Sequence, residues 1–192
     1  MRFVILLFCL GFTAAAPSSA SAQTAEPRPD TDLTPALTNA PTADQLTHAL
    51  SHFERTATAE ELRSLGPNTL QRLMQLYQAT NSPGYVKLRA LGALRHFPAP
   101  ATRSFLVAVL EVPGQVDLHK RHALLSLAHA FGATARDEIR PYLNDPEPVV
   151  REAAGRALAH LGDTLSLRDI AQRVSQENNR YVRETLESLL NR

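Results

Sequence analysis

The stretch DPEPVVREAAGRALAHLGD, residues 145–163, decides the fold predicted for this chain. Its small and aliphatic residues recur at the spacing of one face of an α-helix: Val150, Ala154, Ala157, Leu158 and Leu161. Asp145 and two prolines precede this helix, where they are tolerated, and Gly162 follows it, where glycine favours a stop. The stretch therefore predicts a short helix whose apolar stripe needs a neighbouring element to cover it.

The same pattern recurs along the chain. Val150-Arg151 aligns with Val86-Lys87 and with Val182-Arg183, and Lys120-Arg121 holds the same place in a weaker copy. Successive copies are separated by 34, 30 and 32 residues, a near-constant period that indicates stacked repeats. Second apolar helices are expected between the copies, at residues 70–77, 105–110, 139–143 and 167–174. Each unit is thus a helical hairpin covered by the next hairpin.

The run D-x-x-x-x-V-R-x-x-A-x-x-A-L-x-x-L-G from Asp145 to Gly162 resembles the short bacterial HEAT repeat, also called the phycobilin-lyase-type HEAT-like repeat. The other copies match in part, and the resemblance covers about residues 68–192. It implies an all-α fold, a right-handed α-solenoid of about five stacked helical hairpins. Pro141 suits the kinked outer helices of that family. Residues 43–66, with Leu46, Leu50 and Leu62, are expected to form a degenerate first hairpin.

The N-terminal segment has the pattern of an export signal. Arg2 precedes about ten apolar residues, and Ala20-Ser21-Ala22 predicts cleavage before Gln23. About ten residues fall short of the roughly 20 that span a bilayer, so no membrane span is expected after leader removal. The predicted organisation is a signal peptide at 1–22, a disordered Pro/Thr/Ala-rich linker at 23–42 and a HEAT-like domain at 43–192. The expected location is the periplasm, with secretion as the alternative.

The charge balance and the cysteine content of the chain argue against two classes of function. The whole chain has 20 basic and 19 acidic residues, and Arg2 leaves with the leader, so the mature protein has no net charge. This balance argues against nucleic acid as a partner, because nucleic-acid-binding proteins carry a basic excess. Cys9 is the single cysteine and also lies in the leader, so the mature chain has no thiol for nucleophilic catalysis.

The resemblance implies that the inner helices, which carry the Val-Arg motif, line the concave face of the solenoid. Their outward positions combine two tyrosines, aliphatic residues and mixed charges, which is typical of a protein-binding groove. The residues expected to contact a protein partner are Tyr85, Leu88, Arg95, His122, His129, Glu152, Arg156 and Tyr181. Homodimerisation is left open as a further mode of association.

Charged residues recur near the start of each inner helix. In the family that this chain resembles, the basic residues Lys87, Arg121, Arg151 and Arg183 more often pair with acidic groups of neighbouring units than with phosphate. Asp145 and Glu177 each lie five residues before the valine of the motif, where a helix N-terminus favours negative charge. Asp145 is also a candidate N-cap.

Histidines gather on the third inner helix. His119, His122, Ser126 and His129 are predicted on the side opposite Leu124 and Leu127. One helix cannot wrap three ligands around one ion, because residues 119 to 129 span roughly 15 Å. His119 and His122 could still bind an ion together with a ligand from a neighbouring helix. The alternative function is therefore a metal- or small-ligand-binding protein, even an enzyme. No metal or other cofactor is predicted for the protein.

Enzymatic activity is not expected. Phycobilin lyases with HEAT-like repeats act in the cytosol, which conflicts with the export signal. HEAT-like deoxyhypusine hydroxylases bind iron through His-Glu dipeptides, and no histidine here precedes a glutamate. HEAT-like DNA glycosylases need a basic concave face, and the chain has no Gly-x-Ser-x-Gly, P-loop or Rossmann motif. The predicted function is a protein-interaction scaffold or adaptor.

Overall fold

The structure is a computed structural model, and it describes residues 42–51 and 57–191. All of these residues belong to one compact unit, Leu33–Arg192. The predicted signal peptide (1–22) and the predicted linker (23–42, apart from Thr42) lie outside the described residues. The described residues form helices and no strands, which confirms the all-α prediction. None of these helices has the length and apolar content needed to cross a bilayer.

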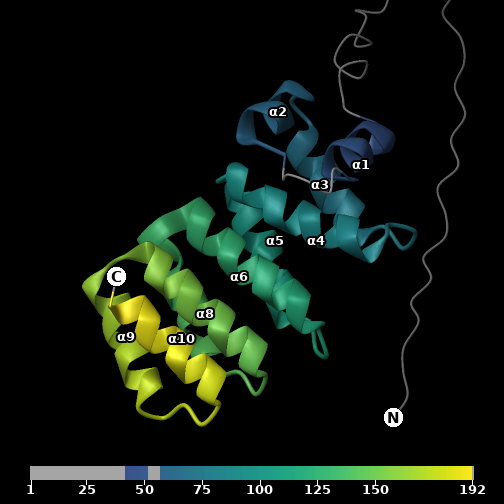
Figure 1. Cartoon of the computed structure of the whole chain (residues 1–192). Helices are drawn as coiled ribbons and strands as arrows, with labels where there is room; N and C mark the ends of the chain where they lie inside the picture. Colours follow the sequence, from purple (N-terminus) through teal and green to yellow (C-terminus); the bar gives the residue numbers. More distant parts are fainter. Residues whose placement is uncertain (1–41, 52–56, 192) are drawn as a thin grey trace, which may run out of the picture. The chain divides into compact units, whose positions relative to one another are not determined.

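Helical hairpins follow one another along the chain (Figure 1). The pairs, each made of an outer and an inner helix in contact, are α3 (Thr69–Gln78) with α4 (Gly84–Ala93), α5 (Pro100–Glu111) with α6 (Asp117–Phe131), α7 (Arg136–Ile139) with α8 (Pro148–Leu161), and α9 (Thr164–Val174) with α10 (Arg180–Leu190). The inner helices stack in the order α4, α6, α8 and α10, each against the next. The repeat pattern of the sequence therefore predicted both the hairpins and their order.

The first hairpin is shorter than the others. Helices α1 (Ala43–Ser51) and α2 (Ala59–Ser64) occupy residues 43–66, where a degenerate hairpin was predicted. Leu46, Leu50 and Leu62 are buried, and α1 packs against both α3 and α4. Thr58 caps α2 through a reciprocal pair of hydrogen bonds with Glu61. The packing of α1 brings Leu50 beside the inner helix α4.

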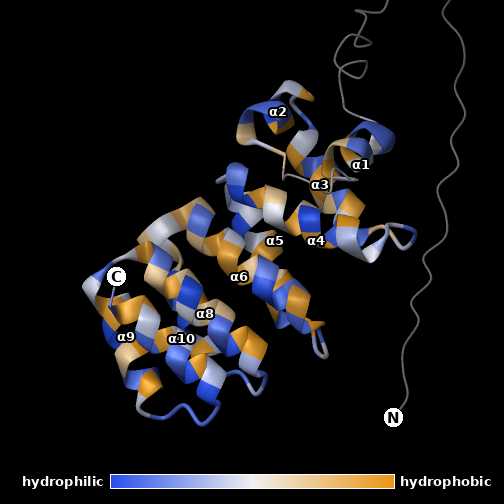
Figure 2. Cartoon of the chain, in the orientation of Figure 1, coloured by the Kyte–Doolittle hydropathy of each residue, from blue (hydrophilic) through white to orange (hydrophobic). Residues whose placement is uncertain are grey.

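Small residues allow the inner helices to approach closely. Ala90, Ala123, Ala154 and Ala157 are fully buried along the stack. Gly155 is the extreme case, because a methyl group added there would lie 2.1 Å from Leu186 Cδ2 on α10. Hydrophobic and hydrophilic residues alternate around each helix, as the colours of Figure 2 show. This alternation matches helices that are covered on one face and exposed on the other.

Prolines and glycines set the ends of the helices as the sequence indicated. Helix α8 ends at Gly162, which adopts the left-handed conformation with φ of 70°. The outer helix of the same hairpin changes from α7 to the 3₁₀ helix η4 (Arg140–Asn144) at the residue before Pro141. This break is expected, because proline lacks the N–H that an α-helix needs.

The prediction that Asp145 caps α8 is wrong in detail. Glu147 occupies the N-cap position, and its side chain makes no capping hydrogen bond. Asp145 Oδ1 instead accepts the Glu147 backbone N–H at 3.0 Å, and Oδ2 accepts from Lys120 Nζ on α6 at 3.0 Å. The carboxylate therefore joins two hairpins instead of capping one helix.

A carboxylate that accepts from both a backbone N–H and a basic side chain recurs one repeat later. Glu177 Oε1 accepts the Asn179 backbone N–H at 2.9 Å, and Arg151 of α8 donates to both Glu177 carboxylate oxygens at 2.8 Å. Arg121 of α6 pairs with Glu152 of α8 at 3.4 Å. The expectation that basic residues of this register pair with acids of neighbouring units is confirmed for Arg121 and Arg151. These ion pairs fix the register between successive hairpins.

Candidate functional site

A cavity of about 260 Å³ lies between the inner helices α4 and α6. We call it the α4–α6 cavity. Helix α4 contributes Leu88 and Gly92, four residues apart on one face, and the 3₁₀ helix η2 (Leu94–His96) continues that face with Arg95. Helix α6 contributes His122, Leu125 and Ser126. The cavity thus lies where the faces of two neighbouring inner helices meet.

The interior of the cavity is mainly apolar. Its carbon-rich lining comes from three helices and the segment before α2: Leu50, Ala57, Leu88, Ala93 and Leu125. Gly92 adds no side chain to the wall of the cavity. A methyl group added there would lie 3.7 Å from His122 Nδ1, which is an ordinary contact distance. Such an apolar concavity with a few polar groups at its edge is typical of ligand sites and of pockets for an anchoring side chain.

The polar side chains of the lining are basic or neutral. Arg89 donates to the Leu50 carbonyl at 2.6 Å, which ties α4 to the end of α1. Arg95 donates through Nε to His96 Nε2 at 3.4 Å. Among the described residues that line the cavity, none is an aspartate or a glutamate. The charged side chains among the described residues of the lining are therefore those of Arg89 and Arg95.

The two histidines of the lining are held in their neutral form. Burial lowers the pKa of His122, and the nearby charges of Arg121, His119 and Arg95 lower it further. Burial also lowers the pKa of His96, together with Arg95 and Arg63. A neutral imidazole can donate one N–H without adding a full charge. The two imidazoles are consequently uncharged members of the lining at neutral pH, beside the guanidinium of Arg95.

Ser126 lies on the predicted side of α6, with His122, but it is more deeply buried than expected. The residue was expected on the outward side with the histidines, but it is buried, and its hydroxyl donates to the Leu91 carbonyl at 2.8 Å. A buried hydroxyl needs such a partner, and here the bond joins α6 to α4. Ser126 therefore forms the back wall of the α4–α6 cavity and fixes the distance between the two helices.

Five of the eight predicted partner-binding residues lie in two hollows. Leu88, Arg95 and His122 come together in the α4–α6 cavity. Arg156 and Tyr181 line a separate hollow of about 230 Å³ between α8 and α10, with Glu184 and Ser188. The second hollow is shallow and polar, and Tyr181 at its edge is 62% exposed. The first group forms a built pocket, whereas the second forms an open surface.

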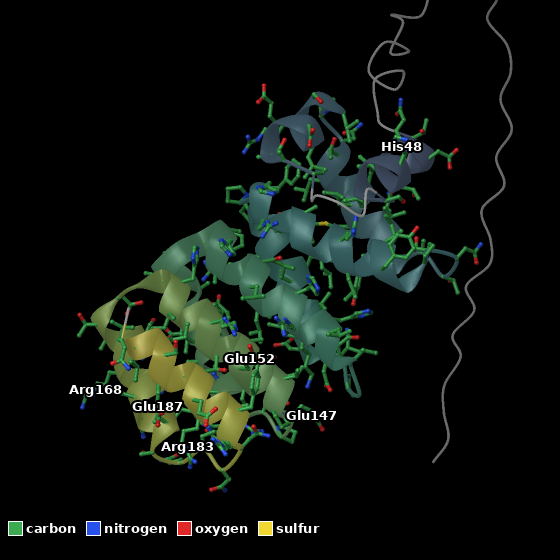
Figure 3. The ribbon with its side chains drawn as sticks, viewed as in Figure 1. His48, Glu147, Glu152, Arg168, Arg183 and Glu187 are labelled. Carbon is green, nitrogen blue, oxygen red and sulfur yellow. The ribbon has the colours of Figure 1, made fainter. Side chains whose placement is uncertain are left out.

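Three further predicted residues lie outside both places. Tyr85 is exposed near the start of α4, and His129 stacks on His160 with ring centres 3.8 Å apart. Glu152 is only 2% exposed, and its carboxylate accepts from Arg121 and from Arg156 at 2.6 Å (Figure 3). Glu152 therefore has almost no surface with which to contact a partner, and it positions the two arginines instead.

The residues of the alternative metal site are engaged elsewhere. His119 Nδ1 lies 3.1 Å from the hydroxyl of Tyr77 on the outer helix α3, and the two rings meet edge to face. His122 faces the α4–α6 cavity. Over residues 42–51 and 57–191, no three His, Cys, Asp or Glu side chains are grouped so that they could hold a metal ion.

Sequence reasoning missed several residues of the cavity. Arg89, His96 and Leu125 were not among the predicted partner-binding residues, because the prediction considered each helix alone and not the junction between two helices. Leu50 and Ala57 come from the first hairpin, whose weak repeat pattern gave no register relative to α4.

The comparison with known families identifies the repeats. A family model described as HEAT repeats matches residues 115–191, which include α6 to α10. No curated protein matches the chain. The hairpin of α3 and α4 precedes the matched range, yet its inner helix packs on α6 as α6 packs on α8. The structure therefore extends the stack of hairpins N-terminally beyond the residues that the family model matches.

Proposed function

This chain is a HEAT-repeat protein, matched as such over residues 115–191, and we propose that it is an exported interaction module that binds another protein through its inner helices. HEAT repeats generally mediate protein–protein interactions, and stacked hairpins offer an extended, preorganised surface. The proposed binding centre is the α4–α6 cavity, and the residues proposed to contact the partner there are Leu88, Arg95 and His122. No bond is made or broken in this mechanism.

The cavity is the observation that supports this proposal best. Interfaces draw most of their affinity from a few side chains that enter well-packed pockets, while surrounding contacts exclude water. The apolar interior beside Leu88 and Leu125 suits such an anchoring side chain. Because Ser126 and Arg89 bond across the helices, the pocket is formed before the partner arrives.

The open surface at α10 is proposed as a secondary contact. Arg156 is held by Glu152 beside the exposed ring of Tyr181. Tyrosine and arginine are enriched at protein interfaces, which favours the same interpretation. A partner long enough to reach from α4 to α10 would contact both places.

Export rests on the sequence of the first 22 residues. We propose that the leader is removed before Gln23 and that the mature protein acts in the periplasm. The proline-rich segment 23–42 would then serve as a tether that gives the repeat domain reach around its partner. Secretion is the alternative destination for the same leader.

A small ligand is the second candidate for the cavity. Its volume of about 260 Å³ and its apolar lining with a few polar groups suit a small organic molecule. His122 would then contact the ligand directly. The metal-dependent form of this alternative has less support, since His119 is engaged with Tyr77.

Site-specific photo-crosslinking in living cells tests the proposed function. The crosslinking residue replaces Leu88, Arg95 or Leu125 in turn, and Arg168 on the outer helix α9 provides the control, since it projects at the far side of the stack (Figure 3). We expect one discrete protein adduct from the first three positions and none from Arg168. An adduct of two copies of this chain would identify homodimerisation. Silence at all cavity positions, with the protein folded, would rule out a protein partner at this cavity.

A further inference from the structure

We propose that the α4–α6 cavity binds the free C-terminus of a partner protein, with its carboxylate on Arg95 and an aliphatic last side chain in the apolar interior. The inference rests on the proposed function and names the kind of partner segment that the cavity recognises. Two features of the cavity support it: an arginine with unused donors and a size suited to one residue.

Arg95 has hydrogen-bonding capacity to spare. Its Nε donates to His96, and its two terminal amino groups donate to no acceptor among the described residues. Elsewhere in the stack, Arg103, Arg151 and Arg173 each meet a carboxylate with two or more hydrogen bonds. Arginine binds carboxylates through paired, parallel hydrogen bonds, which are stronger than bonds between neutral groups. Arg95 thus lacks the kind of partner that a bound carboxylate would supply.

The volume of the cavity suits one aliphatic residue. About 260 Å³ corresponds to roughly nine water-sized groups at ~30 Å³ each. A terminal leucine has about that number of non-hydrogen atoms once both carboxylate oxygens are counted. The aliphatic side chain would pack against Leu50, Leu88 and Leu125. A long acyl chain, by contrast, has more carbon atoms than this volume holds.

A terminal aliphatic residue matches the charge and the apolar lining of the cavity better than other ligands do. A phosphate group or a nucleic acid would place only polar atoms against the leucines and alanines of the lining, and burial of polar atoms without partners is costly. An internal peptide segment would need two residues for the same contacts, an aliphatic one for the apolar space and an aspartate or glutamate for Arg95. A terminal aliphatic residue satisfies both parts of the cavity at once. Recognition of a C-terminal carboxylate is also an established way for folded domains to bind peptides.

Two peptide libraries test the inference. In the first library, random heptapeptides are fused to the C-terminus of a carrier protein, so that each has a free C-terminal carboxylate. In the second, the same heptapeptides are followed by a fixed Gly-Lys-Lys tail. The purified full-length protein should enrich peptides from the first library with leucine, isoleucine, valine or methionine at the last position. It should enrich none from the second library. Equal enrichment from both libraries, or enrichment from neither, would overturn the inference.

The best peptide is then synthesised as the free acid and as the C-terminal amide. We expect the amide to bind at least about tenfold more weakly, and Arg95→Ala to weaken binding of the acid by a similar factor. Arg95→Lys should fall between the two, since lysine keeps the charge but loses the paired geometry. Arg168→Ala provides the matched control and should bind like the unaltered protein. Far-ultraviolet circular dichroism verifies that each variant is folded.

The outcomes distinguish this inference from the proposed function. If acid and amide bind equally, or Arg95→Ala binds the acid normally, the cavity does not recognise a carboxylate. Crosslinking from Leu88 and Leu125 to a discrete protein would then still support an interaction module. If crosslinking is also silent, the proposed function falls together with the inference.

Discussion

At the scale of single residues, Glu177 carries the most demanding interactions in the stack. Its side chain is fully buried, and it accepts hydrogen bonds from Arg151, from Arg173 and from the Asn179 backbone. Burial alone would raise the pKa of this carboxyl, but these hydrogen bonds outweigh burial and lower the pKa to about 2. Glu177 therefore stays ionised and joins α8, α9 and the start of α10.

Replacing Glu177 tests this joint. Glu177→Gln keeps the shape of the side chain but leaves the Arg151 guanidinium without its countercharge, so we expect a loss of about 3 kcal/mol in the free energy of unfolding. Urea unfolding followed by circular dichroism gives the measurement. Glu184→Gln is the control, because the Glu184–Arg180 pair is exposed, and its effect should be small. Equal effects of the two changes would contradict the role given to Glu177.

The same carboxylate predicts a pH dependence. The folded-state pKa of Glu177, about 2, lies below its ordinary value of 4.5, so its contribution is complete above about pH 5. That contribution is lost as the pH falls towards 2. The difference in unfolding free energy between the unaltered protein and Glu177→Gln should therefore shrink from about 3 kcal/mol at pH 6 towards zero near pH 2. Urea titrations across this range measure it, and a constant difference would refute the assignment.

At the scale of helices, replacing each of two glycines by alanine should have opposite effects on stability. Gly155→Ala places a methyl group 2.1 Å from Leu186 Cδ2, and Leu186 is fully buried between α8 and α10. The clash should outweigh the gain in helix propensity and destabilise the protein by about 1–2 kcal/mol. Thermal and urea unfolding provide the measurement. Leu186→Ala should cost less in the Gly155→Ala background than alone, because the two side chains compete for one space.

Gly92→Ala is the matched substitution in α4. The nearest atom to the added methyl group is His122 Nδ1 at 3.7 Å, which is an ordinary contact. The fold should therefore be unchanged or stabilised by up to about 1 kcal/mol, since alanine favours the helix. The methyl group also narrows the α4–α6 cavity, so partner crosslinking from Leu88 should decrease. Loss of stability comparable to that of Gly155→Ala would contradict the packing described for α4 and α6.

The sequence predicted the helices better than the site that they form. The period of the Val-Arg motif located α4, α6, α8 and α10, and Pro141 and Gly162 marked the break and the end that the structure has. The burial of Ser126 was not predicted, because a helical pattern shows which positions differ from the apolar face and not which neighbour a short polar side chain meets. The cavity depends on contacts between helices, and a single helical stripe does not contain that information.

At the scale of the whole molecule, the repeats account for the fold, and the first 22 residues are the basis of the proposed export. We expect processing of the chain to give a mature protein that begins at Gln23. Intact-mass measurement and N-terminal sequencing of protein from the periplasmic fraction verify this. Ala22→Leu provides the control, because a bulky residue at the cleavage position should leave the precursor unprocessed. Recovery of the uncleaved chain from the cytoplasm would contradict export.

Amide hydrogen exchange tests whether a protein partner binds at the α4–α6 cavity. Exchange is measured for the protein alone and in complex with the partner identified by crosslinking. We expect slower exchange at residues 88–96 and 122–126 on binding, with α9 unchanged. Slower exchange at α9 without any change at residues 88–96 and 122–126 would contradict it.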